Sequence, residues 1–141
     1  MPVYTTKVLW TGGHDGELTC GNGPKMSFSA PPALQGRSGV MTPEDAFVGA
    51  LNMCFHLMFL WAAERLKIHL VSYECEAEGH VVDLLDRTST FKRTVLKPAI
   101  KVKANSVKRV GKALEWARKY GLVANSIKAP VVVEPTIESE P

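Results

Sequence analysis

Three cysteines carry most of the chemistry that this sequence could perform. Cys20, Cys54 and Cys75 lie far apart, and no CxxC or Cys/His pair has the spacing of metal ligands. We therefore expect neither a metal site nor a cofactor. An odd number of cysteines does not fit a disulfide-stapled secreted protein, and the N-terminus lacks the basic and apolar regions of a signal peptide. We expect a cytoplasmic protein with reduced thiols.

Cys54 lies between two polar residues in an otherwise apolar segment. Asn52 and His56 are four residues apart, so on a helix they share one face, whereas Cys54 projects to the opposite side. His56 is therefore badly placed as a general base for Cys54. We expect Asn52 and His56 to form a polar pair at a helix–helix or subunit contact. Taken alone, Cys54 fits a packed, small apolar side chain as well as a nucleophile.

Residues 42–67 are predicted to form the long helix that positions these side chains. Thr42 can cap its first turn, Pro43 suits the first helical position, and the acidic Glu44 favours the positive end of the helix dipole. The helix would span roughly 39 Å, about the width of a domain. Its apolar stretch, residues 46–63, is short for a membrane span and holds polar residues in its middle. We expect it inside a soluble protein and not in a membrane.

Strand and helix patterns on either side of this helix predict an α+β fold. Strands are expected at 3–10, 18–20, 25–29, 68–82, 90–104 and 131–137, with a turn near Glu78-Gly79 and a bulge or sheet edge at Pro98. A second helix is expected at 107–120, capped by Ser106 and ended by Gly121, then a short helix within 122–128. Residues 138–141 would be a frayed tail. Mostly antiparallel sheets would pack on the central helix.

One domain of residues 1–141 is expected, with N-terminal strands (3–30), the central helix (42–67) and a C-terminal strand-helix-strand part (68–137). The net charge is only +3. Basic residues look scattered apart from one group, which we expect to be a solvated face: Lys97, Lys101, Lys103, Lys108 and Arg109. Without a basic patch interleaved with aromatic residues, nucleic-acid binding is not expected.

Three short motifs repeat a known pattern. Residues 42–55 (TPEDAFVGALNMCF) hold a Pro-Glu helix start that leads into an Ala-containing helix with Cys-Phe, and residues 11–16 (TGGHDG) form a glycine-rich turn. Residues 121–127 (GLVANSI) precede the PVVV of the last strand. Together they resemble the OsmC/Ohr family of osmotically induced and organic hydroperoxide resistance proteins, over residues 3–137. The resemblance implies an OsmC-like fold and an interwoven homodimer.

The resemblance also implies a thiol peroxidase. In that family a peroxidatic cysteine reduces an organic hydroperoxide, a resolving cysteine then closes a disulfide, and an external thiol reductant opens it. An arginine of the glycine turn and a helix-entry glutamate support the thiolate. Cys54 matches the peroxidatic cysteine and Glu44 the glutamate. His14 stands at the arginine position, and Gly121 stands at the resolving position, or Leu122 if the alignment slips by one.

Because His14 replaces the arginine and no cysteine stands at the resolving position, the sequence leaves more than one way to complete the reaction cycle. Histidine has an unperturbed pKa of about 6.5 and is largely neutral at pH 7, and it lacks the guanidinium fork. Without a resolving thiol, a sulfenic acid on Cys54 needs another partner. Cys20, Cys75 or an external thiol could serve.

Three functions follow from the sequence. The first is a thiol peroxidase that uses Cys54 with Glu44 and His14 in support. The second is a non-catalytic dimer that binds a small apolar or acyl ligand at the subunit interface. In the third, Cys54 only packs. Side chains that could line an apolar pocket are Phe47, Met53, Phe55, Met58, Phe59 and Trp61.

Overall fold

The computed structural model describes residues 1–141, which form two compact units. The first unit runs from Met1 to Phe47 and the second from Val48 to Pro141. Helix α1 (Pro43–Arg65) begins in the first unit and continues through the second. The predicted α+β class is confirmed, because each unit contains a β-sheet and helices accompany them.

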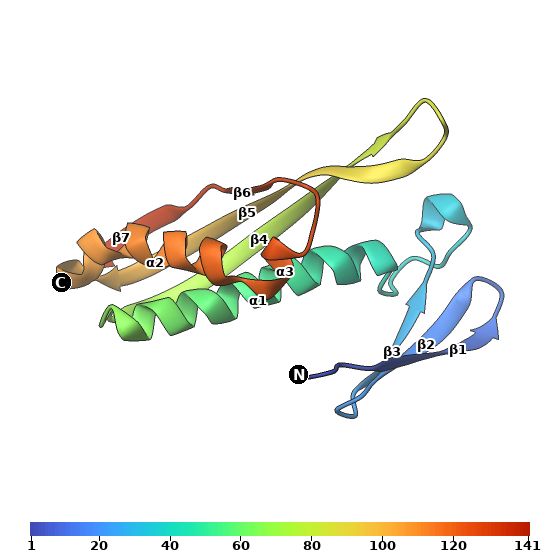
Figure 1. Ribbon diagram of the computed structural model, residues 1–141, viewed down its shortest axis with the longest axis horizontal. Helices are drawn as coiled ribbons and strands as arrows, with labels where there is room; N and C mark the ends of the chain where they lie inside the picture. Colours follow the sequence, from blue (N-terminus) through green and yellow to red (C-terminus); the bar gives the residue numbers. More distant parts are fainter. The chain divides into compact units, whose positions relative to one another are not determined.

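The first unit is an antiparallel meander of three strands, drawn in blue in Figure 1. Strands β1 (Thr6–Gly12), β2 (Asp15–Cys20) and β3 (Lys25–Ser29) pair in chain order. Gly12 and Gly13 have φ angles of 116° and 52°, so the tight β1–β2 turn depends on glycine. A 3₁₀ turn at Pro32–Leu34 follows β3.

A reciprocal hydrogen-bond pair fixes the start of α1. The backbone N–H of Thr42 donates to Asp45 Oδ2 at 3.0 Å, and the backbone N–H of Asp45 donates to Thr42 Oγ1 at 3.1 Å. This is a capping box, which satisfies two backbone donors that the helix leaves free. The predicted role of Thr42 is confirmed, and the helix begins at Pro43.

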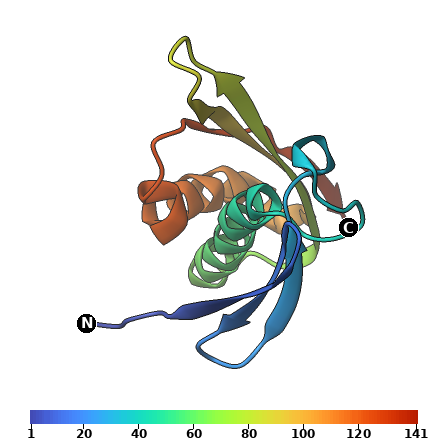
Figure 2. The ribbon, with the colours of Figure 1, turned by 90° about the vertical axis from the view of Figure 1, so that its right-hand side faces the viewer.

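The second unit packs two helices on one mixed sheet. Strands β4 (Leu70–Asp83) and β5 (Ser89–Lys103) form a long antiparallel hairpin, and β6 (Val131–Val133) and β7 (Thr136–Glu140) both pair with β5 in parallel. Figures 1 and 2 show α1 and α2 (Val107–Tyr120) side by side against one face of this sheet. The core joins Leu51, Phe55 and Phe59 of α1 with Leu96, Ile100 and Val102 of β5 and with Val110, Ala113 and Ala117 of α2.

Two expectations about the hairpin are wrong. No turn forms at Gly79, and β4 runs straight through it, because the glycine makes room for packing. A Cβ there would lie 2.6 Å from Phe91 and 2.7 Å from Val48. Pro98 marks neither a bulge nor an edge strand. It lies on the central strand β5, opposite Cys75, between the residues paired with β6 and those paired with β7.

Two expectations about the ends of elements are also wrong. Ser106 does not cap α2 with its side chain, because its hydroxyl accepts a hydrogen bond from the backbone N–H of His69 at 2.9 Å. The C-terminal residues 138–140 are not frayed. They belong to β7, where Glu140 forms an ion pair with Lys103 at 2.9 Å. A parallel partner strand therefore holds the end of the chain. The short helix α3 (Leu122–Asn125) follows Gly121, as expected.

Removing the helix cap should destabilise the protein. Thr42→Ala loses the hydroxyl that accepts the Asp45 N–H, so the free energy of unfolding should fall by about 1 kcal/mol in urea denaturation. Thr42→Ser keeps the hydroxyl and should stay close to the wild type. Equal stability of the Ala variant and the wild type would show that the capping box contributes nothing.

Candidate functional site

Cys54 lies half-buried midway along α1, and its sulfur faces the junction between α2 and α3. A Cβ built on Gly121 would lie 3.9 Å from Cys54 Sγ. Gly121 is buried and has φ −74° and ψ 118°, an extended backbone that any residue adopts. The room beside the sulfur therefore comes from a missing side chain and not from a backbone that requires glycine.

Positions 121 and 122 differ in their access to Cys54. Leu122 is 69% exposed, whereas Gly121 is buried beside the sulfur. Of the two, position 121 is therefore the one from which a side chain could approach the Cys54 sulfur.

Asn52 and His56 face strand β4, on the other side of α1. Asn52 Nδ2 donates to the backbone carbonyl of Cys75 at 3.1 Å, and the ring centroids of His56 and Tyr73 are 4.8 Å apart. The shared face predicted from their spacing is correct, but the partners of both residues lie on β4. With Met53, these side chains line a shallow groove of about 320 Å³.

Cys75 is not placed to resolve Cys54 within one subunit. Asn52 reaches Cys75, and Cys54 projects from the opposite side of the same helix, toward Gly121. Burial also raises the pKa of the Cys75 thiol, which lowers its thiolate fraction at neutral pH. Cys20 lies half-buried at the end of β2 in the N-terminal unit.

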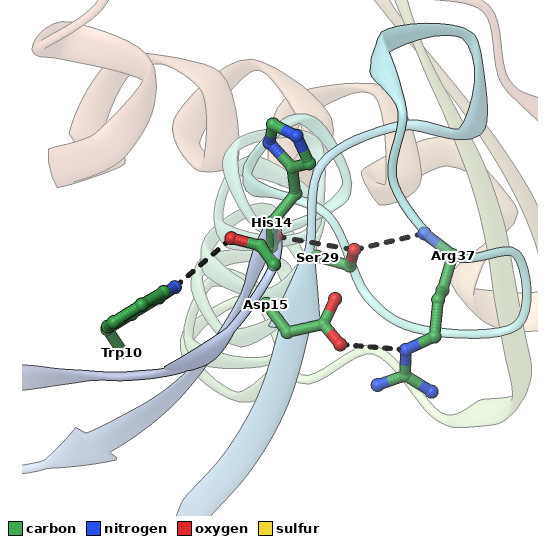
Figure 3. A network of polar contacts seen from close by, with 6 residues as sticks. Trp10, His14, Asp15, Ser29 and Arg37 are labelled. Atoms are coloured by element: carbon green, nitrogen blue, oxygen red, sulfur yellow. Dashed lines mark hydrogen bonds and ion pairs between the residues drawn. The ribbon is translucent and has the colours of Figure 1, made fainter.

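His14 lies at the β1–β2 turn, where a hydrogen-bond network ties it to the loop after β3 (Figure 3). Its backbone carbonyl accepts bonds from Ser29 Oγ at 3.4 Å and from the Ala30 N–H at 3.3 Å. The backbone N–H of Arg37 donates to Ser29 Oγ at 3.0 Å, and Arg37 Nε donates to Asp15 Oδ2 at 2.9 Å. The side chain of His14 is exposed.

Arg37 is a residue of this network that no sequence motif indicates. Its guanidinium forms an ion pair with Asp15, the residue that follows His14 in the glycine turn. The side chain of Arg37 is 60% exposed. The hydroxyl of Ser29 and the Arg37 guanidinium both lower the pKa of Asp15. Because Arg37 and Asp15 are 22 residues apart, no local motif reveals the pair.

Glu44 occupies the first turn of α1, half-buried, where the helix dipole favours a carboxylate. The structure places His14 and Glu44 in the N-terminal unit and Cys54 in the C-terminal unit. Their assembly into one site therefore stays a prediction. No group of three His, Cys, Asp or Glu side chains lies close enough to hold a metal ion.

Of the α1 side chains that could line an apolar pocket, Phe55 and Phe59 are fully buried residues of the core. Phe47 instead belongs to an apolar cavity of about 440 Å³ in the N-terminal unit. Its other lining residues are Val8, Leu18, Phe28, Met41, Pro43 and Ala46.

Comparison with protein families matches residues 36–136 to the family described as OsmC-like protein. The match covers well over half of the sequence. The chain belongs to this family. The matched residues of this OsmC-like protein include Arg37, Glu44, Cys54 and Gly121 but not His14. None of the curated protein sequences matches it.

Solved structures of OsmC-like and organic hydroperoxide resistance proteins share the fold. An OsmC-like protein of unknown function from Vibrio cholerae aligns with a TM-score of 0.87 and 24% identity, over 96% of this chain and 99% of that one. An organic hydroperoxide resistance protein from Elizabethkingia anophelis aligns with a TM-score of 0.74 and 15% identity, over 99% and 98% of the chains. One from Legionella pneumophila aligns with a TM-score of 0.73 and 18% identity, over 98% of each chain.

A cysteine introduced at position 121 should bond to Cys54. In a background with Cys20→Ser and Cys75→Ser, Gly121→Cys should form an intrachain disulfide on mild oxidation, because its Cβ would lie 3.9 Å from Cys54 Sγ. Mass spectrometry and free-thiol counting measure the bond. Leu122→Cys is the matched control, and its exposed side chain should leave both thiols free. A disulfide in the control alone would refute the assignment of position 121.

Proposed function

We propose that this OsmC-like protein reduces organic hydroperoxides at Cys54 with an external thiol. The observation that carries the proposal is the half-buried Cys54 sulfur beside the side-chain-free position 121. The thiolate attacks the terminal peroxide oxygen, the O–O bond breaks, and with one proton the products are an alcohol and a Cys54 sulfenic acid. Similarity in fold to organic hydroperoxide resistance proteins supports the same reaction.

Glu44 and His14 are proposed to support the Cys54 thiolate, as the family resemblance implies. A thiolate needs a nearby positive charge, since only the ionised sulfur is a good nucleophile.

The cycle is proposed to use one protein cysteine. Gly121 offers no thiol, and Cys75 lies across α1 from Cys54. An external thiol then attacks the Cys54 sulfenic acid beside Gly121, which forms a mixed disulfide and releases water. A second external thiol attacks that disulfide, which returns the Cys54 thiol and leaves an external disulfide. Such a cycle suits a reducing compartment, and we propose that the protein is cytoplasmic.

A homodimer is proposed because one chain leaves α1 uncovered. The helix is apolar on nearly every side, yet only 28% of its most apolar stretch is buried within the chain. Met53 and Leu57, one turn apart, are 64% and 62% exposed. By length and composition α1 could also cross a membrane. Its packing in a core with β5 and α2 favours a soluble protein in which a second copy covers the exposed side.

The apolar cavity in the N-terminal unit favours a second candidate function. Its lining is almost wholly hydrocarbon, and its volume of about 440 Å³ falls within the range of small-molecule sites. In this alternative the protein binds a small apolar or acyl ligand and Cys54 is inert. The two functions differ in whether Cys54 reacts with peroxide.

Replacing Cys54 should abolish peroxide reduction. Consumption of cumene hydroperoxide with dithiothreitol should fall to the uncatalysed rate in Cys54→Ser, because no other thiol can replace the nucleophile. Cys20→Ser and Cys75→Ser are the matched controls and should keep the wild-type rate. Equal loss in all three variants would contradict the assignment of Cys54, and an inactive wild type would leave the ligand-binding function.

A charge on the exposed side of α1 should dissociate the dimer. Leu57→Glu would place a carboxylate against the apolar side of the second copy, which is costly to bury. Analytical ultracentrifugation should show a dimer for the wild type and a monomer for Leu57→Glu. Leu85→Glu, at another exposed position, is the control and should remain dimeric. A wild-type monomer would refute the proposed assembly.

A further inference from the structure

The glycine turn between β1 and β2 is held by residues on both of its sides (Figure 3). Its two glycines permit the tight reversal, but they also leave the backbone with much conformational freedom. The indole Nε1 of Trp10 donates to the Gly13 carbonyl at 3.1 Å. The next carbonyl, that of His14, accepts bonds from Ser29 Oγ at 3.4 Å and from the Ala30 N–H at 3.3 Å. Two consecutive carbonyls of the turn are therefore tied to neighbouring residues.

Ser29 is the centre of this arrangement, and it is fully buried, with 0% of its surface exposed. Its hydroxyl donates to the His14 carbonyl and accepts a bond from the backbone N–H of Arg37 at 3.0 Å. Its backbone N–H donates to the carbonyl of Met41 at 2.9 Å, directly before the capping residue Thr42. One serine therefore joins the glycine turn to the loop after β3 and to the start of α1.

The loop after β3 folds back so that Arg37 meets Ser29. A 3₁₀ turn at Pro32–Leu34 begins the reversal. Gly36 then passes so close to the preceding chain that a Cβ there would overlap the carbonyl oxygen of Ala30. The route of the loop, and with it the place of Arg37, depends on the absence of a side chain at this glycine.

Arg37 makes a second link to the glycine turn. Its Nε donates to Asp15 Oδ2 at 2.9 Å, and Asp15 directly follows His14. The hydroxyl of Ser29 is the largest influence that lowers the pKa of Asp15, and the Arg37 guanidinium lowers it further, so this carboxylate is ionised at neutral pH. The Arg37 side chain is 60% exposed, which makes this link weaker than the one through the buried serine.

The His14 side chain depends on these backbone links for its position. Its imidazole is exposed, so the surrounding protein does not pack it into one place. The position of the imidazole therefore follows the backbone of the turn, which Ser29 holds. Position matters for a group at a reacting site, because a misplacement of about 1 Å can lower a rate about 100-fold.

We propose that Ser29 is a positioning residue whose buried hydroxyl holds the glycine turn so that His14 supports the Cys54 thiolate; this rests on the proposed peroxidase function. Through Met41, Ser29 also ties the turn to the first turn of α1, where Glu44 lies. His14 and Glu44 belong to the same compact unit. Ser29 thus holds the two proposed supporting groups in a fixed relation to each other.

The test is a double-mutant cycle on the reduction of cumene hydroperoxide with dithiothreitol. Ser29→Ala should lower kcat/KM for the peroxide about tenfold, because the hydroxyl that holds the turn is lost. In a His14→Ala background the same change should cost less than about twofold, since the group that Ser29 positions is already gone. Ser27→Ala, exposed and on the same strand, is the matched control and should not change the rate in either background.

A second variant keeps the test valid if Ser29→Ala does not fold, which thermal unfolding checks. Arg37→Met removes only the link to Asp15, and its exposed position makes unfolding unexpected. It should lower kcat/KM about threefold in the wild-type background and leave the rate of His14→Ala unchanged. Lys25→Met, exposed in the same unit and equal in charge change, is its control and should behave as the wild type.

Three outcomes would overturn the positioning role. They are equal losses from Ser29→Ala in both backgrounds, which indicate a merely structural serine, a full rate in Ser29→Ala, and a full rate in His14→Ala. If the wild type reduces no peroxide, the peroxidase function itself fails. NMR relaxation of the His14 imidazole then tests whether Ser29 holds the turn. The ring should be more mobile in Ser29→Ala than in the wild type and Ser27→Ala, and equal mobility would refute the holding as well.

Discussion

The structure depends on covering a helix that is apolar on nearly every side. Such a helix is stable in water only where other apolar groups exclude solvent from its whole circumference. Strand β5 and helix α2 cover the side that carries Leu51, Phe55 and Phe59. This packing turns Cys54 toward the α2–α3 junction and leaves Met53 and Leu57 exposed on another side of the helix. The position of the Cys54 sulfur is therefore a consequence of how the core packs.

Local signals in the sequence predicted the helices well. The capping residue Thr42 and the apolar spacing of residues 107–120 act within a few residues, so the boundaries of α1 and α2 agree with the structure to within two residues. The predictions that are wrong depend on contacts between residues far apart in the sequence. The sequence around Gly79 predicts a turn, because nothing local reveals that Phe91 packs over it. The sequence of residues 138–140 predicts a frayed tail, because their partner β5 lies more than 30 residues earlier.

The residues of the candidate site also fall into two groups: those that local sequence signals indicate and those that only the fold brings together. Cys54, Glu44 and His14 came from motif resemblance, and helical spacing correctly separated Cys54 from the Asn52 side of α1. The contact between Arg37 and Asp15, and the tilted contact between the rings of Trp61 and Trp116, join segments that only the fold brings together. The choice between positions 121 and 122 likewise required knowledge of which residue is buried beside the sulfur.

The most direct test of the account is to trap the first oxidation product. The purified protein is treated with one equivalent of cumene hydroperoxide in the presence of dimedone, and the peptides are then analysed by mass spectrometry. The account predicts a single dimedone adduct, on Cys54, which reports its sulfenic acid. An unmodified Cys54, or an adduct on Cys20 or Cys75 instead, would contradict the claim that this sulfur is the reacting group.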